Sequence, residues 1–559
     1  MCGFFLKKTF FPKVCFRLIQ IKNASLRFIF SAMKQILLLA LLFISFFSYG
    51  QKRETYPPIP FDSTLYKSKL QFLKQPANGN SKKNIILIVA DDMGKYDLSI
   101  YGNPFISTPN IDQLAKDGIL FNTGYSTAPV CSPSRAGFLT GRYQQRFGYH
   151  IQPHQRYANS KFQLWAFQHL INTSYLKPEN YAAYPSKTER LKQGLPHSEI
   201  TLSELLHHNG YRTAWIGKWN LGYSEDMSAQ NYGFDYCYGF NEAYSLYANP
   251  HDKNIVNARI HEFTDRIIWK GGRKGACAIY ENGVKINEKE YLTYAIFRRA
   301  KAFISQQSNQ PFFVYLPVNA PHTPYQAPKD IYNQLSNIQD HNKRVYYSII
   351  KALDNSIGDL ITYLKQIGQY DNTLIVFTSD NGAELYSQVL DNKPLNGGKF
   401  TLFEGGINIP LIISCPSLIK TPQKVDEMVS LLDLFPTIAE VTNTTLPTDR
   451  TYDGYSLTPY FSPQTKNFPK HEYLFWYMSY NSAIRNQHLK VIQDTLNNKL
   501  DIFDFSKNRY ELIDISPSKE SYELLQKLKE FRAKMPRMYW PRVMNYEVKI
   551  NGKIYRWGV

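Results

Sequence analysis

Four short runs of apolar residues constrain the fold of this chain most strongly. They are residues 84–90, 312–316, 374–378 and 411–414. An unbroken apolar run is typical of a parallel strand that is buried on both faces of a sheet. Stretches with helical periodicity lie among these runs, at 111–116, 202–208, 291–305 and 346–367. Strands that alternate with helices predict an α/β fold in which helices sandwich a large, mostly parallel sheet.

The chain is long enough for one large domain and a smaller one. It has 559 residues, of which 43% are hydrophobic, an ordinary share for a globular protein. We expect the large domain over residues 81–465, because the pattern of strands and helices changes near residue 465. A smaller α+β subdomain is expected over residues 466–559. Its predicted strands lie at 489–492 and 502–505, and its predicted helix at 522–534.

The first 50 residues have the pattern of an export signal. A basic start at Met33-Lys34 is followed by the apolar run 36–47 and then by Ser-Tyr-Gly. This order is typical of a secretory signal peptide, and the run is too short to be a stable membrane anchor. We interpret residues 1–32 as an upstream extension with Met33 as the true start; an unusually long basic region is the alternative. Residues 51–80 are expected to be an extended lead-in, and the protein to be periplasmic or secreted.

The chain is strongly basic. Its formal net charge is +19, from 65 basic and 46 acidic residues. Such a charge favours anionic partners through long-range electrostatic steering. Since the sequence has no basic cluster or nucleic-acid motif, we do not expect nucleic acid to be the partner.

Cysteines are few, and each has a different expected role. They are Cys2, Cys15, Cys131, Cys237, Cys277 and Cys415. The first two fall in the predicted leader, and Cys415 follows an apolar run and is expected to be a buried thiol. Cys237 and Cys277 either pair in an oxidising compartment or stay free, and the sequence leaves both possibilities open.

Polar side chains follow two of the predicted strands directly. Asp91 and Asp92 follow the first run, and Asp380 and Asn381 follow the run 374–378. Ligands gather at the carboxyl ends of strands in open α/β sheets. Three carboxylates and one amide oxygen suit Ca²⁺ or Mg²⁺ better than zinc. The alternative is that each pair is a turn or a helix cap.

A cysteine motif stands ahead of a predicted helix. Residues 131–142 are CSPSRAGFLTGR, and the helix is expected to begin near Ser134, after Pro133. The N-terminus of a helix favours an anion, and Arg135 can direct its forked donors toward a group bound there. An unmodified Cys131 at this place would be a thiolate with a lowered pKa, which is an alternative nucleophile.

The spacing C-x-P-x-R from Cys131 to Arg135 resembles the signature of the type I, formylglycine-dependent sulfatases, which have an alkaline-phosphatase-like fold. Three further segments resemble blocks of that family in the same order: GYRTAWIGKW at 210–219, PHTP at 321–324 and GGK at 397–399 with EGG at 404–406. The resemblance extends over about 84–445 and more loosely over the tail. Several blocks in the right order are a far stronger indication than one short motif.

The resemblance implies a set of site residues. Cys131 would be oxidised to formylglycine by a formylglycine-generating enzyme, and the hydrate of this aldehyde would attack a sulfate ester. The implied metal ligands are Asp91, Asp92, Asp380, Asn381 and the modified residue 131, with Ca²⁺ favoured and Mg²⁺ possible. Lys218 would contact the nucleophile and the sulfate, His322 would be a general acid at the leaving oxygen, and Lys399 would bind a sulfate oxygen.

The chain departs from the family pattern in two places. Asn220 stands where family members typically have a histidine that accepts a proton as sulfate leaves, and Asn cannot take up that proton. An aromatic-rich segment near 154–193 is longer than the family's usual connection. We interpret it as an insertion that either shapes substrate binding or decorates the surface.

These features predict a sulfatase that hydrolyses O-sulfate esters of a carbohydrate. The basic charge and the export signal favour a sulfated polysaccharide or its oligosaccharides as substrate. A phosphoester or phosphonate hydrolase of the same superfamily is one alternative. The other is a non-catalytic protein that binds sulfated glycans, with Asn220 marking lost turnover.

Overall fold

The computed structural model describes most of the chain beyond the predicted leader. The described residues are 57–77, 83–154, 160–171, 173, 175–178, 185–260, 263–307, 310–462 and 470–559. The predicted signal peptide, with Cys2 and Cys15, and the predicted domain boundary near 465 lie outside them. Within the lead-in, the prediction of extended chain is wrong for helix α2 (Ser63–Phe72), which Asp62 caps by accepting a hydrogen bond from the Leu65 N–H. Among the described helices, none is both long and apolar enough to cross a membrane.

Five parallel strands form the centre of the large sheet. In spatial order they are β11 (Thr373–Ser379), β1 (Asn84–Asp91), β9 (Phe312–Pro321), β4 (Arg212–Lys218) and β5 (Tyr236–Phe240). Every residue of β1 is buried, as its unbroken apolar run predicts. The predicted runs in β1, β9 and β11 are therefore confirmed as parallel strands.

Both flanks of this sheet contain antiparallel pairs. On one side β12 (Asn408–Ser414) and β2 (Gly118–Tyr125) follow β11, and on the other β7 (Ile279–Glu281) and β8 (Val284–Ile286) follow β5. The short strands β13 (Gln423–Val425) and β14 (Val429–Ser430) pair with β2 in parallel. The run 411–414 is thus a strand, but an antiparallel one. Burial on both faces makes a strand apolar in either direction, so the run could not indicate the direction.

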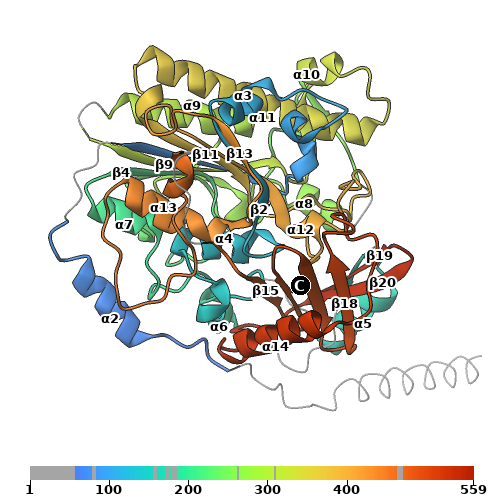
Figure 1. Ribbon diagram of the computed structural model, residues 1–559. Coiled ribbons are helices and arrows are strands. Elements are labelled where there is room, and N and C mark those ends of the chain that lie inside the picture. The colour runs from blue at the N-terminus through green and yellow to red at the C-terminus, as the bar shows by residue number, and fades with distance from the viewer. Residues whose placement is uncertain are drawn as a thin grey trace, which may run out of the picture.

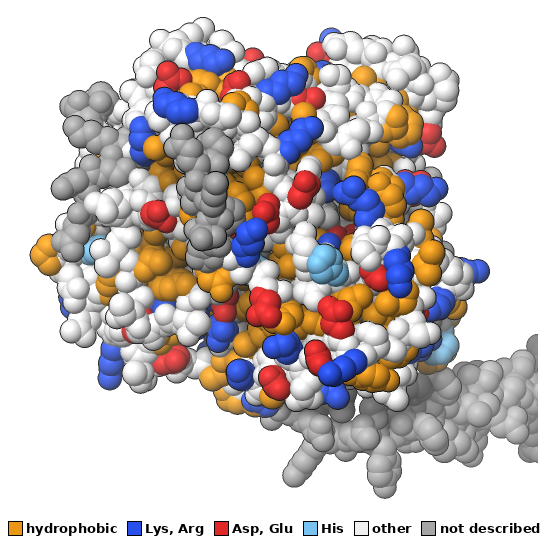
Figure 2. Space-filling view, in the orientation of Figure 1, with side chains coloured by type: hydrophobic (Ala, Val, Ile, Leu, Met, Phe, Trp, Pro, Cys, Tyr) orange, Lys and Arg blue, Asp and Glu red, His pale blue; other side chains and the backbone are white. Residues whose placement is uncertain are grey.

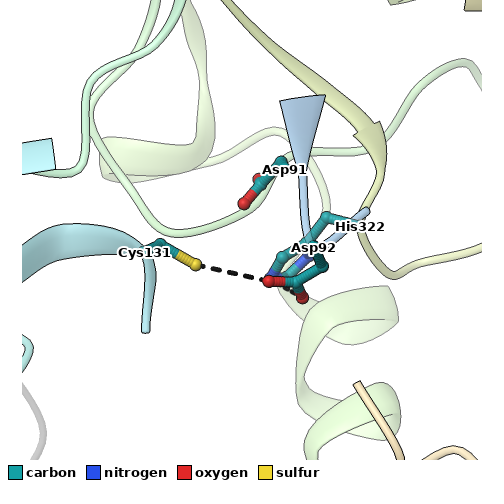
Figure 3. A group of neighbouring side chains, drawn as sticks. All are labelled: Asp91, Asp92, Cys131 and His322. Atoms are coloured by element: carbon teal, nitrogen blue, oxygen red, sulfur yellow. Dashed lines mark hydrogen bonds and ion pairs between the residues drawn. The ribbon is translucent and has the colours of Figure 1, made fainter. Parts of the chain in front are cut away.

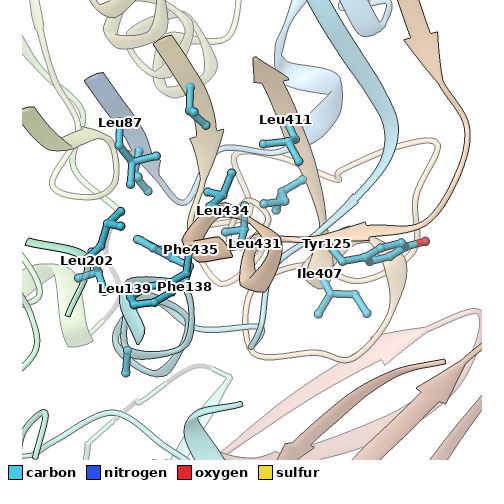
Figure 4. Packing of buried hydrophobic residues seen from close by; sticks show 14 of the residues in the cluster. Leu87, Tyr125, Phe138, Leu139, Leu202, Ile407, Leu411, Leu431, Leu434 and Phe435 are labelled. Carbon is cyan, nitrogen blue, oxygen red and sulfur yellow. The ribbon is translucent and has the colours of Figure 1, made fainter. Parts of the chain in front are cut away.

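Helices cover both faces of the sheet, which confirms the predicted sandwich (Figure 1). One face carries α3 (Pro109–Lys116), α9 (Leu292–Ser305) and α11 (His341–Gln366). The other carries α4 (Cys131–Thr140), α7 (Leu202–His208) and α13 (Leu434–Val441). Figure 4 shows the second layer, where Phe138 and Leu139 of α4 lie beside Phe435 under the sheet residue Leu87.

Smaller elements surround this core. They are the helices α8 (Phe263–Gly271), α10 (Lys329–Gln334) and α12 (Glu404–Ile407) and the antiparallel pair β6 (Ile255–Asn257) and β10 (Gln326–Pro328). On the face seen in Figure 2, Lys and Arg side chains are interspersed with Asp and Glu and are not gathered into one basic patch.

The last hundred residues form a second, smaller unit beside the large sheet. An antiparallel meander of β15 (Leu474–Met478), β16 (Asn481–Arg485), β17 (Leu489–Asp494) and β18 (Lys499–Asp504) packs on α14 (Lys519–Ala533). The contact is apolar, with Leu524 and Leu528 of the helix against Val491 and Ile502 of the strands. The predicted strands and helix of the α+β subdomain are present.

The predicted insertion is tied to the end of the chain. It contains α5 (Lys161–His169), β3 (Leu176–Pro178) and α6 (Lys187–Leu191). Strand β3 pairs with β19 (Met544–Ile550), which forms a hairpin with β20 (Lys553–Gly558). This small sheet joins segments far apart in sequence, which no local pattern indicated.

The four described cysteines are buried, and none of them forms a disulfide: Cys131, Cys237, Cys277 and Cys415. The buried thiol predicted at Cys415 is confirmed, and of the two possibilities for Cys237 and Cys277 the structure has the one without a disulfide between them.

Candidate active site

Two strand ends bring the four predicted oxygen ligands together. Asp91 is the last residue of β1, and Asp92 follows it in a left-handed turn with φ of 62°. Asp380 and Asn381 follow β11, the strand hydrogen-bonded to β1. The Asp92 N–H donates to Asp380 Oδ1 at 3.2 Å, and Asn381 Nδ2 donates to Asp92 Oδ1 at 2.8 Å. All four side chains are buried, so their charges need compensation from the protein or from a bound ion.

Cys131 is the first residue of α4 and points into this cluster (Figure 3). Its Sγ lies 3.6 Å from Asp92 Oδ1. The helix thus begins three residues before the predicted start at Ser134, so that the cysteine itself occupies the first turn. Burial, and next the Asp380 carboxylate, raise the pKa of the thiol well above its usual value. The expectation of a low-pKa thiolate is therefore wrong, because burial and acidic neighbours outweigh the helix terminus.

The cluster has the donors that a divalent cation needs. Ligand atoms of Asp91, Asp92, Cys131 and His322 all lie within 4.8 Å of one another. The Oδ1 atom of Asn381 is buried and has no hydrogen-bond partner among the described residues, so a lone pair is left for a ligand. Carboxylate and amide oxygens fit Ca²⁺ or Mg²⁺. His322 was not among the predicted ligands.

Two fully buried basic residues form ion pairs with these acids. Lys218, at the end of β4, donates from Nζ to both oxygens of Asp91, at 2.8 and 2.7 Å. Arg135, on the first turns of α4, forks Nε and Nη2 onto Asp380 Oδ2 at 2.9 and 2.7 Å. Both basic side chains are fully buried. We expected Arg135 to direct its fork toward the group at residue 131; instead the fork holds Asp380 in place.

His322 and Lys399 close the other side of the cluster. Lys399 Nζ lies 2.7 Å from Asp92 Oδ2 and 3.2 Å from His322 Nε2. His322 Nδ1 donates to the Thr323 carbonyl oxygen at 2.6 Å. Burial and then the Lys399 charge lower the pKa of His322 to about 3, so the ring is neutral and accepts at Nε2. Burial works against ionisation of Asp92, but Lys399, His322 and Lys218 hold its pKa well below the usual range.

Asn220 lies beside the start of α4. Its backbone carbonyl accepts a hydrogen bond from Ser132 Oγ at 2.5 Å, and Ser132 Oγ also lies 2.5 Å from the Tyr149 hydroxyl. Asn220 has φ of 58°, a left-handed conformation that Asn tolerates better than most residues. Its Oδ1 is buried without a partner among the described residues. The residue that departs from the family pattern is thus close to the residue after Cys131.

Sequence reasoning missed three polar residues here. Ser132 donates to the Asn220 carbonyl oxygen and is itself hydrogen-bonded to Tyr149, and Asn319 on β9 is buried, with both amide atoms unpartnered among the described residues. Asn319 had a detectable signal, because it is a polar residue at the end of an otherwise apolar strand and three residues before His322. Ser132 and Tyr149 had none, since their contact depends on tertiary packing.

Comparisons with known proteins identify sequences similar to this chain. A family model described as "Sulfatase" matches residues 83–444, and one described as "N-sulphoglucosamine sulphohydrolase, C-terminal" matches residues 398–536. N-acetylgalactosamine-6-sulfatase from Homo sapiens is 33% identical over 382 residues, which is 67% of this chain and 65% of that protein. Steryl-sulfatase from Homo sapiens is 28% identical over 487 residues, 75% of this chain and 78% of that protein. The chain thus spans slightly less than two thirds of the first relative's length.

A solved structure gives a matching overall fold. The crystal structure of Ps i-CgsB aligns with a TM-score of 0.68 and 30% identity, and covers 82% of this chain and 95% of that chain. Its complex with k-i-k-neocarrahexaose aligns with a TM-score of 0.67. Because the family model covers well over half of the residues, in the same fold, the chain belongs to the sulfatase family.

Proposed function

We propose that this protein is a sulfatase that hydrolyses O-sulfate esters of a carbohydrate. One observation carries the proposal: Cys131, at the first residue of α4, points at Asp92 within a cluster of acids, amides and bases at the strand ends. In the sulfatase family, the cysteine at this position of the signature is the one that is oxidised to formylglycine. As formylglycine hydrate, it would supply a hydroxyl nucleophile for sulfur.

A divalent cation would be held by the oxygens at the two strand ends. Its proposed ligands are Asp91, Asp92, Asp380, Asn381 and the modified residue 131, and Ca²⁺ is the favoured ion. When bound, the cation would supply positive charge that draws electrons from the sulfate. The unpartnered Asn381 Oδ1 supports this proposal.

The basic side chains would bind and orient the sulfate group. Lys218 pairs with Asp91 and Lys399 with Asp92, so their ammonium groups lie in the cluster and would donate to sulfate oxygens and stabilise negative charge as the ester bond breaks. Arg135 would keep Asp380 oriented. His322 Nε2 accepts a hydrogen bond from the Lys399 ammonium group. We propose that this proton is passed, through His322, to the leaving alcohol oxygen.

A sulfated polysaccharide or its oligosaccharides is the proposed substrate. Support comes from the relatives, since N-acetylgalactosamine-6-sulfatase is named for a sulfated sugar and the Ps i-CgsB complex contains a neocarrahexaose. The basic charge and an aromatic content of 15% suit a sulfated, ring-containing ligand. The leader pattern supports export to the periplasm or beyond, and the C-x-P-x-R motif supports maturation by a formylglycine-generating enzyme.

Two alternatives make different predictions. A phosphoester hydrolase of the superfamily generally has Ser or Thr as nucleophile and a second, histidine-rich metal set. Among the described residues a single group of His, Cys, Asp and Glu side chains is arranged to hold a metal. A non-catalytic glycan-binding protein would bind sulfated sugars and release no sulfate.

The test has two steps. Mass spectrometry of the tryptic peptide that ends at Arg135 should show an aldehyde in place of the Cys131 thiol. The purified protein should then release sulfate from p-nitrophenyl sulfate or from a panel of defined sulfated oligosaccharides, and release less phosphate from p-nitrophenyl phosphate. A matched panel with Cys131→Ala gives the background. An intact thiol together with glycan binding but no sulfate release would favour the non-catalytic alternative.

Asn220 provides a second test. Loss of a general base typically lowers a rate by about 10²–10⁴-fold. If hydroxide or water replaces the missing histidine, Asn220→His should raise kcat on the order of 10-fold and weaken the dependence of kcat on alkaline pH. An unchanged kcat and pH profile would show that another group already accepts the proton.

A further inference from the structure

Lys399 is carried by a tightly closed loop, residues 396–406. The Gly405 N–H donates to the Asn396 carbonyl oxygen at 2.7 Å, and the Lys399 N–H donates to the Ala383 carbonyl oxygen at 2.9 Å. A Cβ atom added to Gly405 would collide with the carbonyl oxygens of Asn396 and Gly397. The two ends of the loop are therefore in close contact.

The residue after Lys399 has a strained backbone. Phe400 has φ of 72°, a left-handed conformation that is unfavourable for an aromatic residue, and its N–H donates to the Pro129 carbonyl oxygen at 2.7 Å. Such a conformation persists only where the surrounding structure holds it in place. Something must therefore prevent this loop from relaxing and moving the Lys399 ammonium away from Asp92.

Glu511, in the loop after β18, contacts both ends of this loop. Its carbonyl oxygen accepts from Asn396 Nδ2 at 2.6 Å, and its Oε2 accepts from the Glu404 N–H at 2.7 Å. Glu404 is the first residue of α12, whose N-cap residue Phe403 has no side-chain hydrogen bond to the helix. A carboxylate from the smaller unit thus takes the place of the missing local cap. Glu511 is fully buried.

Buried charges hold Glu511 itself. Lys490 Nζ on β17 lies 2.7 Å from Glu511 Oε1 and 3.0 Å from Glu404 Oε1, and Arg485 Nη1 on β16 lies 2.7 Å from Glu404 Oε2. All four side chains are at least nine-tenths buried. Two acids and two bases form a closed set, in which each carboxylate oxygen has a partner. We call Glu404, Arg485, Lys490 and Glu511 the interdomain cluster.

We propose that Glu511 is a positioning residue, which acts from the smaller C-terminal unit to hold the Lys399 loop in its catalytic geometry. The inference rests on the proposed function, because Lys399 is the group proposed to bind the transferred sulfate. Without the Glu511 carboxylate, α12 loses its cap and the strained Lys399–Phe400 segment loses one of its supports. The large domain supplies the catalytic groups, and the smaller unit keeps one of them in place.

The first test compares Glu511→Ala with Glu520→Ala, a matched change of an exposed acid in the same unit. With p-nitrophenyl sulfate or the best substrate of the panel, Glu511→Ala should lower kcat about 10- to 100-fold, the size expected when a catalytic group is misplaced. KM should change less, and Glu520→Ala should change neither constant. In a Lys399→Met background, Glu511→Ala should cause little further loss, which a general folding defect would not reproduce.

The second test does not need activity. In trace labelling with acetic anhydride, followed by mass spectrometry, Lys399 should become several-fold more reactive in Glu511→Ala, while Lys218 stays protected. If Glu511→Ala does not fold, Asn396→Ala removes the other contact and should give the same change to a smaller degree. The double variant Glu511→Gln/Lys490→Met keeps an oxygen for the Glu404 N–H without the charges, and should restore protection.

The outcomes separate the two proposals. A wild type that releases no sulfate, with Lys399 exposed by Glu511→Ala, contradicts the proposed function and supports the positioning role. Equal protection of Lys399 in folded Glu511→Ala and wild type overturns the positioning role. The positioning role is also overturned if Glu511→Ala lowers kcat by the same factor in the wild-type and Lys399→Met backgrounds.

Discussion

The active-site cluster and the interdomain cluster are both buried sets of charges, but they differ in the groups that lie beside the acids. In the interdomain cluster each oxygen of Glu404 and Glu511 accepts a hydrogen bond or an ion pair. In the active site, Asp91, Asp92 and Asp380 face Lys218, Lys399 and Arg135, yet Asn381 Oδ1 and Asn220 Oδ1 are left unpartnered among the described residues. Unsatisfied buried atoms are costly, and the Asn381 oxygen lies beside carboxylates with which it could share a cation.

Charge balance alone therefore does not identify a functional site. Both clusters pair acids with bases in the interior, and a buried ion pair by itself is weak evidence of either stability or function. What separates the two is that the active site also places Cys131, His322 and the unpartnered Asn381 amide oxygen beside its acids.

The largest effect is expected at the nucleophile. Cys131→Ala should lower sulfate release by roughly 10⁴-fold or more, as removal of a nucleophile does in other enzymes. Because it removes no buried charge, the unfolding temperature should stay close to that of the wild type. Kinetics on the best substrate and thermal unfolding give the two readouts. Retained turnover would show that residue 131 is not the nucleophile.

The next largest effect is expected in the interdomain cluster. Lys490→Met leaves two buried carboxylates with one remaining basic partner and should destabilise the protein by about 3–5 kcal/mol. Denaturant unfolding measures this, with the exposed Lys527→Met on α14 as the matched control. If Lys490→Met lowers the free energy of unfolding no more than Lys527→Met does, the interdomain cluster does not stabilise the protein.

A bound cation should stabilise one cluster specifically. At about 100-fold excess over its Kd, Ca²⁺ should add about 2.7 kcal/mol to the free energy of unfolding. Asn381→Ala removes an oxygen that has no other partner and should weaken this stabilisation, whereas Lys490→Met should leave the shift in place. Thermal unfolding with Ca²⁺, with Mg²⁺ and with a chelator measures it. An equal shift in wild type and Asn381→Ala would place the ion elsewhere.

A pH-dependent effect is expected at a buried acid outside both clusters. Asp97 accepts hydrogen bonds from the Tyr346 hydroxyl at 2.6 Å and the Gly94 N–H at 2.7 Å. Burial raises its pKa from 3.8 to about 7, although the Tyr346 hydrogen bond lowers it. The folded protein therefore holds this proton more tightly than the unfolded chain, so stability from this group is lost as pH rises toward 7.

Asp97→Asn should remove that dependence. The variant keeps an oxygen for both donors, so near pH 4 its stability should match the wild type. At pH 8 it should be more stable by at most about 4 kcal/mol, because the pKa of Asp97 is raised by about three units and each unit corresponds to about 1.4 kcal/mol. Unfolding measured at both pH values tests this, and a difference that is the same at both would contradict the raised pKa.

Much of the site was predictable because it follows short, local patterns. Asp91, Asp92, Asp380 and Asn381 follow apolar strands, and Cys131 and Arg135 are four residues apart at a helix start, so position along the chain indicates position in space. The direction of β12 was not predictable, because an apolar run reports burial and not orientation. Nor was the Arg135 fork, whose direction depends on where Asp380 lies.

By itself, the sequence determined the α/β class, the strand-end position of four polar side chains and the family, because these depend on periodicity and fixed spacing. Tertiary structure alone decided the high pKa of the Cys131 thiol, the pairing of β3 with β19 and the contact of Glu511 with the Lys399 loop. The physical reason is that burial and long-range hydrogen bonds depend on which segments become neighbours. That choice is made by the packing of the whole chain and not by any local run of residues.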